Sequence, residues 1–118
     1  MIRLDLRRML EEAGHEVCAE AADGERAVAL ALVHRPDVVV MDVKMPGLDG
    51  VEAARRILKE QRVPIVMLTA YGYGELISRA VDAGIYAYIV KPFREQDLLE
   101  TVAAATAWNG PDDAPILR

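Results

Sequence analysis

The chain has 118 residues, 53% of them hydrophobic, and a formal net charge of −5. This length suits one domain with its own core, and no apolar run approaches the ~18–20 residues that a membrane span needs. The negative charge argues against non-specific nucleic-acid binding, because phosphates attract clustered Lys and Arg. The single cysteine, Cys18, excludes an internal disulfide. We therefore expect a cytoplasmic protein without a secretory leader.

The first third of the chain predicts two helices around a weak strand. Residues 2–13 carry an apolar stripe at helical spacing. Residues 15–21 alternate only partly between apolar and polar, which predicts a strand at the edge of a sheet. Asp23 then predicts a helix cap ahead of a helix over residues 25–35, which Pro36 ends.

The rest of the chain alternates short apolar runs with amphipathic segments. This alternation predicts an α/β fold, a doubly wound parallel sheet with helices on both faces. We expect one domain over residues 1–108 and a flexible tail over 109–118. Strands are predicted over residues 37–43, 64–69 and 87–90, and helices over 50–60, between the loop 71–74 and Gly84, and over 98–108.

Each of the three buried strands leads to a polar side chain: Asp42, Thr69 and Lys91. Because the carboxyl ends of parallel strands meet at one rim, these side chains are expected to converge. A carboxylate, a hydroxyl and a fixed cation suit a phosphoryl group, whose oxygens must be neutralised during in-line transfer. Each residue alone could simply end a strand, but the three types together favour a phosphoryl site.

The segments around these residues read Val-Met-Asp-Val-Lys-Met-Pro-Gly-Leu-Asp-Gly, Leu-Thr-Ala and Val-Lys-Pro-Phe. They resemble the signature segments of the response-regulator receiver domain of two-component signalling, and the resemblance covers residues 2–108. It implies the flavodoxin-like receiver fold, a five-stranded parallel sheet in the order 2-1-3-4-5. It implies that Asp42 is the phospho-acceptor, and that Thr69 and Lys91 contact the phosphoryl oxygens. A cis peptide bond between Lys91 and Pro92 is implied as well, a form that proline permits.

The resemblance assigns roles to further residues. Tyr88 stands where the family carries its switch aromatic, although a core tyrosine with a wet hydroxyl would look the same in sequence. Lys44 and Tyr71 stand two residues past Asp42 and Thr69, at positions that tune the lifetime of the phosphoryl group. The backbone carbonyl of Lys44 and the Asp42 carboxylate would be Mg²⁺ ligands.

The sequence departs from the family at its beginning. Receivers start with an apolar strand and a pair of acidic residues that completes the Mg²⁺ site, and by alignment both would precede Met1. We therefore expect Mg²⁺ binding by this chain to be weakened or lost, since two carboxylates are absent. We expect the natural protein to begin further upstream. The rival is a genuine short form that borrows a strand, as in a swapped homodimer.

The resemblance implies a signalling switch rather than a metabolic enzyme. A sensor histidine kinase would phosphorylate Asp42, with at most self-phosphorylation and self-dephosphorylation by the chain itself. Among receivers, this one resembles most those that carry an RNA-binding ANTAR output domain. The expected output partner is thus a downstream protein or such a domain, without direct nucleic-acid binding by the receiver. The alternative is a pseudo-receiver that binds proteins constitutively. A small flavodoxin-like enzyme is disfavoured because no Gly-rich phosphate loop is present.

Overall fold

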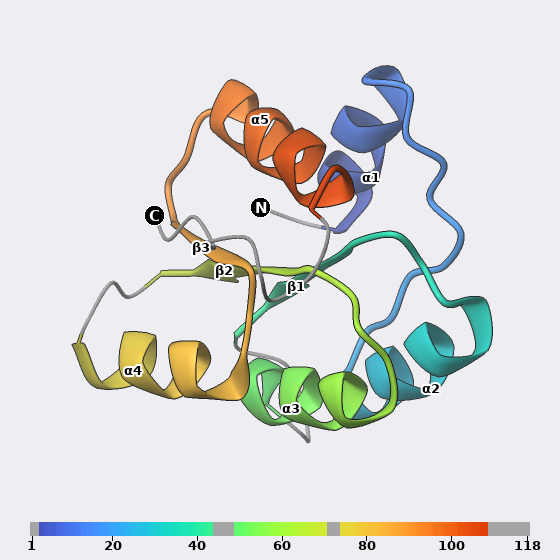
Figure 1. The fold of residues 1–118 in the computed structure, drawn as a ribbon. Coiled ribbons are helices and arrows are strands. Elements are labelled where there is room, and N and C mark those ends of the chain that lie inside the picture. Colours follow the sequence, from blue (N-terminus) through green and yellow to red (C-terminus); the bar gives the residue numbers. More distant parts are fainter. Residues whose placement is uncertain (1–2, 44–48, 71–73, 109–118) are drawn as a thin grey trace.

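The computed structural model of the chain describes residues 3–43, 49–70 and 74–108. A central sheet separates two layers of helices: α2, α3 and α4 cover one face, and α1 and α5 cover the other (Figure 1). Within the described residues, no helix is long and apolar enough to cross a membrane. In chain order the elements are α1 (Arg3–Glu12), α2 (Gly24–His34), β1 (Val39–Asp42), α3 (Gly50–Glu60), β2 (Ile65–Thr69), α4 (Gly74–Ala83), β3 (Ala87–Val90) and α5 (Glu95–Thr106).

The described strands form a parallel sheet in the order β1-β2-β3. Val39 lies beside Ile65, and Thr69 lies beside Val90, so β1 and β3 flank β2. Every residue of β2 is buried. A strand covered on both faces needs apolar side chains pointing both ways, which explains why the β2 sequence is a continuous apolar run rather than an alternating one.

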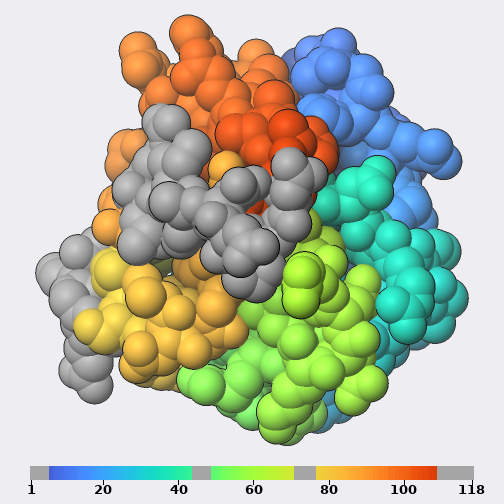
Figure 2. Space-filling view, in the orientation of Figure 1, coloured from blue at the N-terminus to red at the C-terminus, as the bar shows by residue number. Residues whose placement is uncertain are grey.

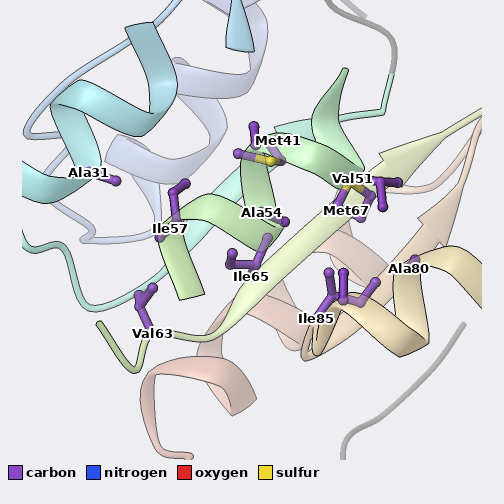
Figure 3. Packing of buried hydrophobic residues seen from close by; sticks show 12 residues of the cluster. Ala31, Met41, Val51, Ala54, Ile57, Val63, Ile65, Met67, Ala80 and Ile85 are labelled. Carbon is purple, nitrogen blue, oxygen red and sulfur yellow. The ribbon is translucent and has the colours of Figure 1, made fainter. Parts of the chain in front are cut away.

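The larger core lies between the sheet and the layer of α2, α3 and α4. Ile65 and Met67 point from β2 into this core, where they meet α3 (Figure 3). Asp49 directly precedes α3, and its side chain accepts a hydrogen bond from the Glu52 N–H and so caps the first turn. The buried face of α3 consists of Val51, Ala53, Ala54 and Ile57. Two alanines on this face let the helix approach the sheet closely.

The opposite core lies under α1 and α5, which lie next to one another in Figure 2 (blue and orange-red). Val66 and Leu68 point into it from β2, as the two-residue period of a strand requires. From α5 it receives Leu98, Val102 and Ala105, and from α1 the partly buried Leu6, Met9 and Leu10. The predicted helix over 98–108 begins three residues earlier, at Glu95, where acidic side chains suit the positive end of the helix dipole.

The predicted strand over residues 15–21 is wrong. These residues belong to no helix or strand, and among the described residues none of them shares a backbone hydrogen bond with β1. A groove of about 910 Å³ separates them from β1 instead, and α1, α2 and α5 contribute to its walls. A strand exists only where a neighbour pairs with its backbone. The described residues supply no strand between β1 and residues 15–21, so these residues form no ladder in the structure.

Candidate functional site

Three strand ends bring the predicted site residues to one rim of the sheet. Asp42 is the last residue of β1, Thr69 is the last residue of β2, and Lys91 follows β3 directly. The Lys91 N–H donates to the Thr69 carbonyl at 2.6 Å, which fixes these two strand ends against each other. Convergence of the three residues follows from the parallel pairing, and the structure places them as the sequence predicts.

The Lys91 ammonium reaches across the end of β2 and donates a hydrogen bond to Oδ1 of Asp42. The Asp42 side chain is 38% exposed and the Lys91 side chain 27%. Both groups are therefore accessible from solvent while they remain paired. A cation held beside an exposed carboxylate compensates negative charge at the rim, where an incoming anion would add more.

The other predicted site residues differ in burial, and two of them are not described by the structure. Thr69 is buried, with only 3% of its surface exposed. Tyr88 is partly buried and packs against the core on the side of α2, α3 and α4. The peptide bond between Lys91 and Pro92 is cis. Lys44 and Tyr71 lie outside the described residues.

The described side chains do not form a Mg²⁺ cage by themselves. Mg²⁺ prefers oxygen ligands in octahedral geometry, usually including one or two carboxylates. In the three described ranges, no group of three or more His, Cys, Asp or Glu residues could hold a metal ion. Asp42 is instead paired with Lys91. Of the predicted Mg²⁺ ligands, the described residues therefore supply the carboxylate of Asp42, and Lys44 lies outside them.

Two residues at the start of α3, Gly50 and Asp49, form contacts that the sequence pattern did not predict. Gly50 donates its N–H to the Val43 carbonyl at 2.7 Å. A Cβ at Gly50 would lie 2.2 Å from the carbonyl oxygen of Asp42. The first turn of α3 therefore lies directly against the backbone of Asp42. The Gly-Leu-Asp-Gly sequence signals a turn, but only the structure shows what this glycine touches.

Asp49 is the second of these residues. Its Oδ1 accepts from the Glu52 N–H at 2.9 Å, and its Oδ2 accepts from Nη2 of Arg79 on α4 at 3.2 Å. Partial burial raises the pKa of Asp49, but the Glu52 N–H and the Arg79 guanidinium outweigh it and leave this pKa below its usual range. An Asp before a helix predicts the cap; no local pattern predicts the partner 30 residues away.

Residues 1–103 match the response regulator receiver domain family. This chain is a receiver domain of that family. It is 50% identical over 107 residues to the transcriptional regulatory protein PdtaR of Mycobacterium tuberculosis, covering 91% of this chain and 52% of PdtaR. The receiver thus spans about half the length of this relative. It is 36% identical over 102 residues to the chemotaxis protein CheY of Bacillus subtilis, covering 86% of this chain and 85% of CheY.

Solved structures agree with the receiver fold. The receiver domain of the Pseudomonas aeruginosa sensor histidine kinase PA1611 aligns with a TM-score of 0.82 and 32% identity, over 90% of this chain and 88% of that one. That structure has a magnesium ion in its active-site cleft. The receiver domain of Mycobacterium tuberculosis NarL aligns with a TM-score of 0.85 and 26% identity, over 91% and 88%. The predicted family and fold class are confirmed, and with them a role in two-component signalling.

Proposed function

We propose that this receiver accepts a phosphoryl group on Asp42 from the phosphohistidine of a sensor kinase. The observation that carries the proposal is the Asp42–Lys91 pair at the rim where β1, β2 and β3 end. It presents a solvent-accessible carboxylate whose charge is already compensated by a cation. Such a group can receive an anion with less electrostatic repulsion than a bare carboxylate can.

The transfer is an in-line displacement. A carboxylate oxygen of Asp42 forms a bond to phosphorus while the bond from phosphorus to the kinase's histidine nitrogen breaks, and the imidazole keeps that electron pair. Lys91 then faces a phosphoryl oxygen rather than the free carboxylate. The Thr69 hydroxyl, at the end of the neighbouring strand, donates a hydrogen bond to another phosphoryl oxygen. In self-dephosphorylation, water attacks the phosphorus, and the bond from phosphorus to the Asp42 oxygen breaks. Lys91 and Thr69 again face the phosphoryl oxygens in this step.

The same proposal includes the output. Movement of Thr69 toward the phosphoryl group would let Tyr88 turn further into the core, which changes the surface of α4, β3 and α5. Lys44 and Tyr71 would tune the phosphoryl lifetime. The partners proposed are a sensor histidine kinase and either a downstream protein or the RNA-binding ANTAR output domain that the sequence resemblance implies, with the cytoplasm as the location. The similarity to a transcriptional regulatory protein, PdtaR, supports an output in gene regulation. The receiver domain proposed is residues 1–108, with 109–118 as a tail.

The test is intact-mass spectrometry after incubation with phosphoramidate, with and without Mg²⁺. The parent chain is expected to gain one phosphoryl group and Asp42→Asn none. Asp37→Asn is the matched control, because Asp37 is an exposed carboxylate just before β1, at the strand's opposite end. Circular dichroism shows that each variant is folded. Equal phosphorylation of parent and Asp42→Asn, or none on a folded parent, would refute the proposal.

A second candidate function, constitutive protein binding, is favoured by the groove beside β1. Val39 and Val43 donate their N–H groups to Pro64 and Leu68 of the β2 side. Because backbone direction alternates along a strand, the N–H and C=O groups of Val40 point the other way, into the groove. An unpaired strand edge is a template for another strand. We propose that a second copy of the chain supplies it by strand exchange.

Sedimentation equilibrium tests this second candidate. Val40→Pro removes the N–H that faces the groove while leaving the bonds to β2 in place, and proline is tolerated at such edge positions. Strand exchange predicts a dimer of the parent chain and a monomer of Val40→Pro. A monomeric parent, or a dimer that Val40→Pro leaves intact, would contradict the exchange.

A further inference from the structure

The carboxylate of Asp49 joins two helices that are otherwise separate in the chain. One oxygen caps α3 through the Glu52 N–H, and the other accepts from the Arg79 guanidinium of α4. Each interaction uses a different oxygen, so the two coexist. Arg79 therefore binds the N-terminal end of α3 rather than its side.

The start of α3 is rigidly tied to Asp42. The 2.7 Å hydrogen bond from Gly50 to Val43 closes the loop between β1 and α3. Gly50 also lies so close to the Asp42 carbonyl that no side chain would fit between them. A displacement of the Asp42 backbone would therefore also displace the first turn of α3, since close-packed groups move together.

The helix α4 packs on α3 through small side chains. Ala80 and Ala83 of α4 are buried in the same core as Val51 and Ile57 of α3, and Figure 2 shows the two helices in contact (yellow-orange and green). The Arg79–Asp49 pair is the polar contact that the described residues place across this interface. It joins the middle of α4 to the N-terminal end of α3.

We propose that Arg79 is a positioning residue that couples α4 to the state of Asp42 through Asp49. The inference rests on the phosphorylation of Asp42 proposed above. A displacement at Asp42 moves Gly50 and Asp49 together with α3. The hydrogen bond from Arg79 to Asp49 then displaces α4 in the same direction. Without Arg79 the chemistry at Asp42 persists, while the response of α4 weakens.

The expected size of the effect is modest. The two side chains are 48% and 45% exposed, and solvent screens such pairs. Exposed ion pairs change an equilibrium by roughly 1.5- to fivefold. Loss of Arg79 should reduce the coupling by a factor in this range, and salt should reduce it similarly in the parent chain.

Hydrogen exchange with and without phosphoramidate measures the coupling, and intact mass confirms the adduct in each sample. Phosphorylation of the parent should change exchange both in the first turn of α3 and in α4. In Arg79→Ala and Asp49→Asn the α3 response should persist and the α4 response should fall. Asn is also a good helix cap, so Asp49→Asn keeps α3 capped. Arg79→Lys should restore part of the response.

Arg55→Ala is the matched control. Arg55 is similarly exposed, at 42% against 48% for Arg79, and pairs with Glu52 within α3 at 3.4 Å. It should respond as the parent does. An undiminished α4 response in Arg79→Ala, or an equal loss in Arg55→Ala, would overturn the inference.

A double-mutant cycle separates this inference from the phosphorylation proposal. If the parent gains no phosphoryl group, exchange of α4 is compared without donor in Arg79→Ala, Asp49→Asn and the double variant. Non-additive effects would support the contact as the coupling element. Additive effects would overturn the proposed coupling, whether or not Asp42 is phosphorylated.

Discussion

Replacement of Gly50 by alanine tests whether α3 lies directly against the backbone of Asp42, the proposed phosphorylation site. The new Cβ would lie 2.2 Å from the Asp42 carbonyl oxygen and 2.9 Å from the Val43 Cα, and real Cβ atoms essentially never come nearer than 3.0 Å. The difference corresponds to a shift of about 0.8 Å. Both obstructing groups are backbone, so no flexible side chain can yield.

Two effects of opposite sign decide the stability of Gly50→Ala. Alanine favours a helix and restricts the unfolded chain, which would stabilise the protein by about 0.4–1 kcal/mol. Forcing extra volume into a packed site costs typically about 1–3 kcal/mol, and a backbone obstruction belongs to the upper part of that range. We therefore expect a net loss of about 1–2 kcal/mol. Because Asp42 must move, phosphorylation should slow by on the order of tenfold or more.

Urea unfolding followed by circular dichroism measures the stability, and the rate of adduct formation by intact mass measures the chemistry. Gly84→Ala is the control: its φ of +91° makes alanine strained, but its Cβ would meet only Leu58 at 3.5 Å, far from the rim. It should lose about 1–2 kcal/mol and phosphorylate at the parent rate. A Gly50→Ala variant as stable and as reactive as the parent would refute the described contact.

Three further predictions follow from single contacts. Leu98→Ala empties a fully buried position of α5 and should cost about 2–5 kcal/mol in urea unfolding; a smaller loss would show a loosely packed α5. Lys91→Met should change stability by no more than about 1 kcal/mol yet slow phosphorylation of Asp42. Because folding lowers the pKa of Asp49, its contribution is present above the ordinary carboxyl pKa of about 3.9 and is lost as the pH falls through the lower folded value. Stability of Asp49→Asn should therefore fall less on acidification than that of the parent.

Local rules predicted much of the site. The polar residues Asp42, Thr69 and Lys91 were identifiable because each ends an apolar run, and parallel pairing places such ends together. The helix cap at Asp23 was also predicted, since a carboxylate before a helix satisfies an unpaired N–H, and the same rule accounts for the cap at Asp49 that the structure adds.

Long-range geometry explains what the sequence analysis missed. Residues 15–21 carry a strand-like pattern, yet the described chain offers them no neighbour, and pattern without a partner does not make a strand. Arg79 meets Asp49 only because α4 packs across α3, a relation that no motif encodes.

The sequence by itself determined the alternation of strands and helices, the family, and the three residues at the rim, because these depend on periodicity and on residues close to strand ends. Only the tertiary structure decided that Lys91 pairs with Asp42, that Gly50 touches the Asp42 backbone, and that a groove lies beside β1. Those features depend on distances between segments far apart in the chain, which packing of the two cores sets and local propensity does not.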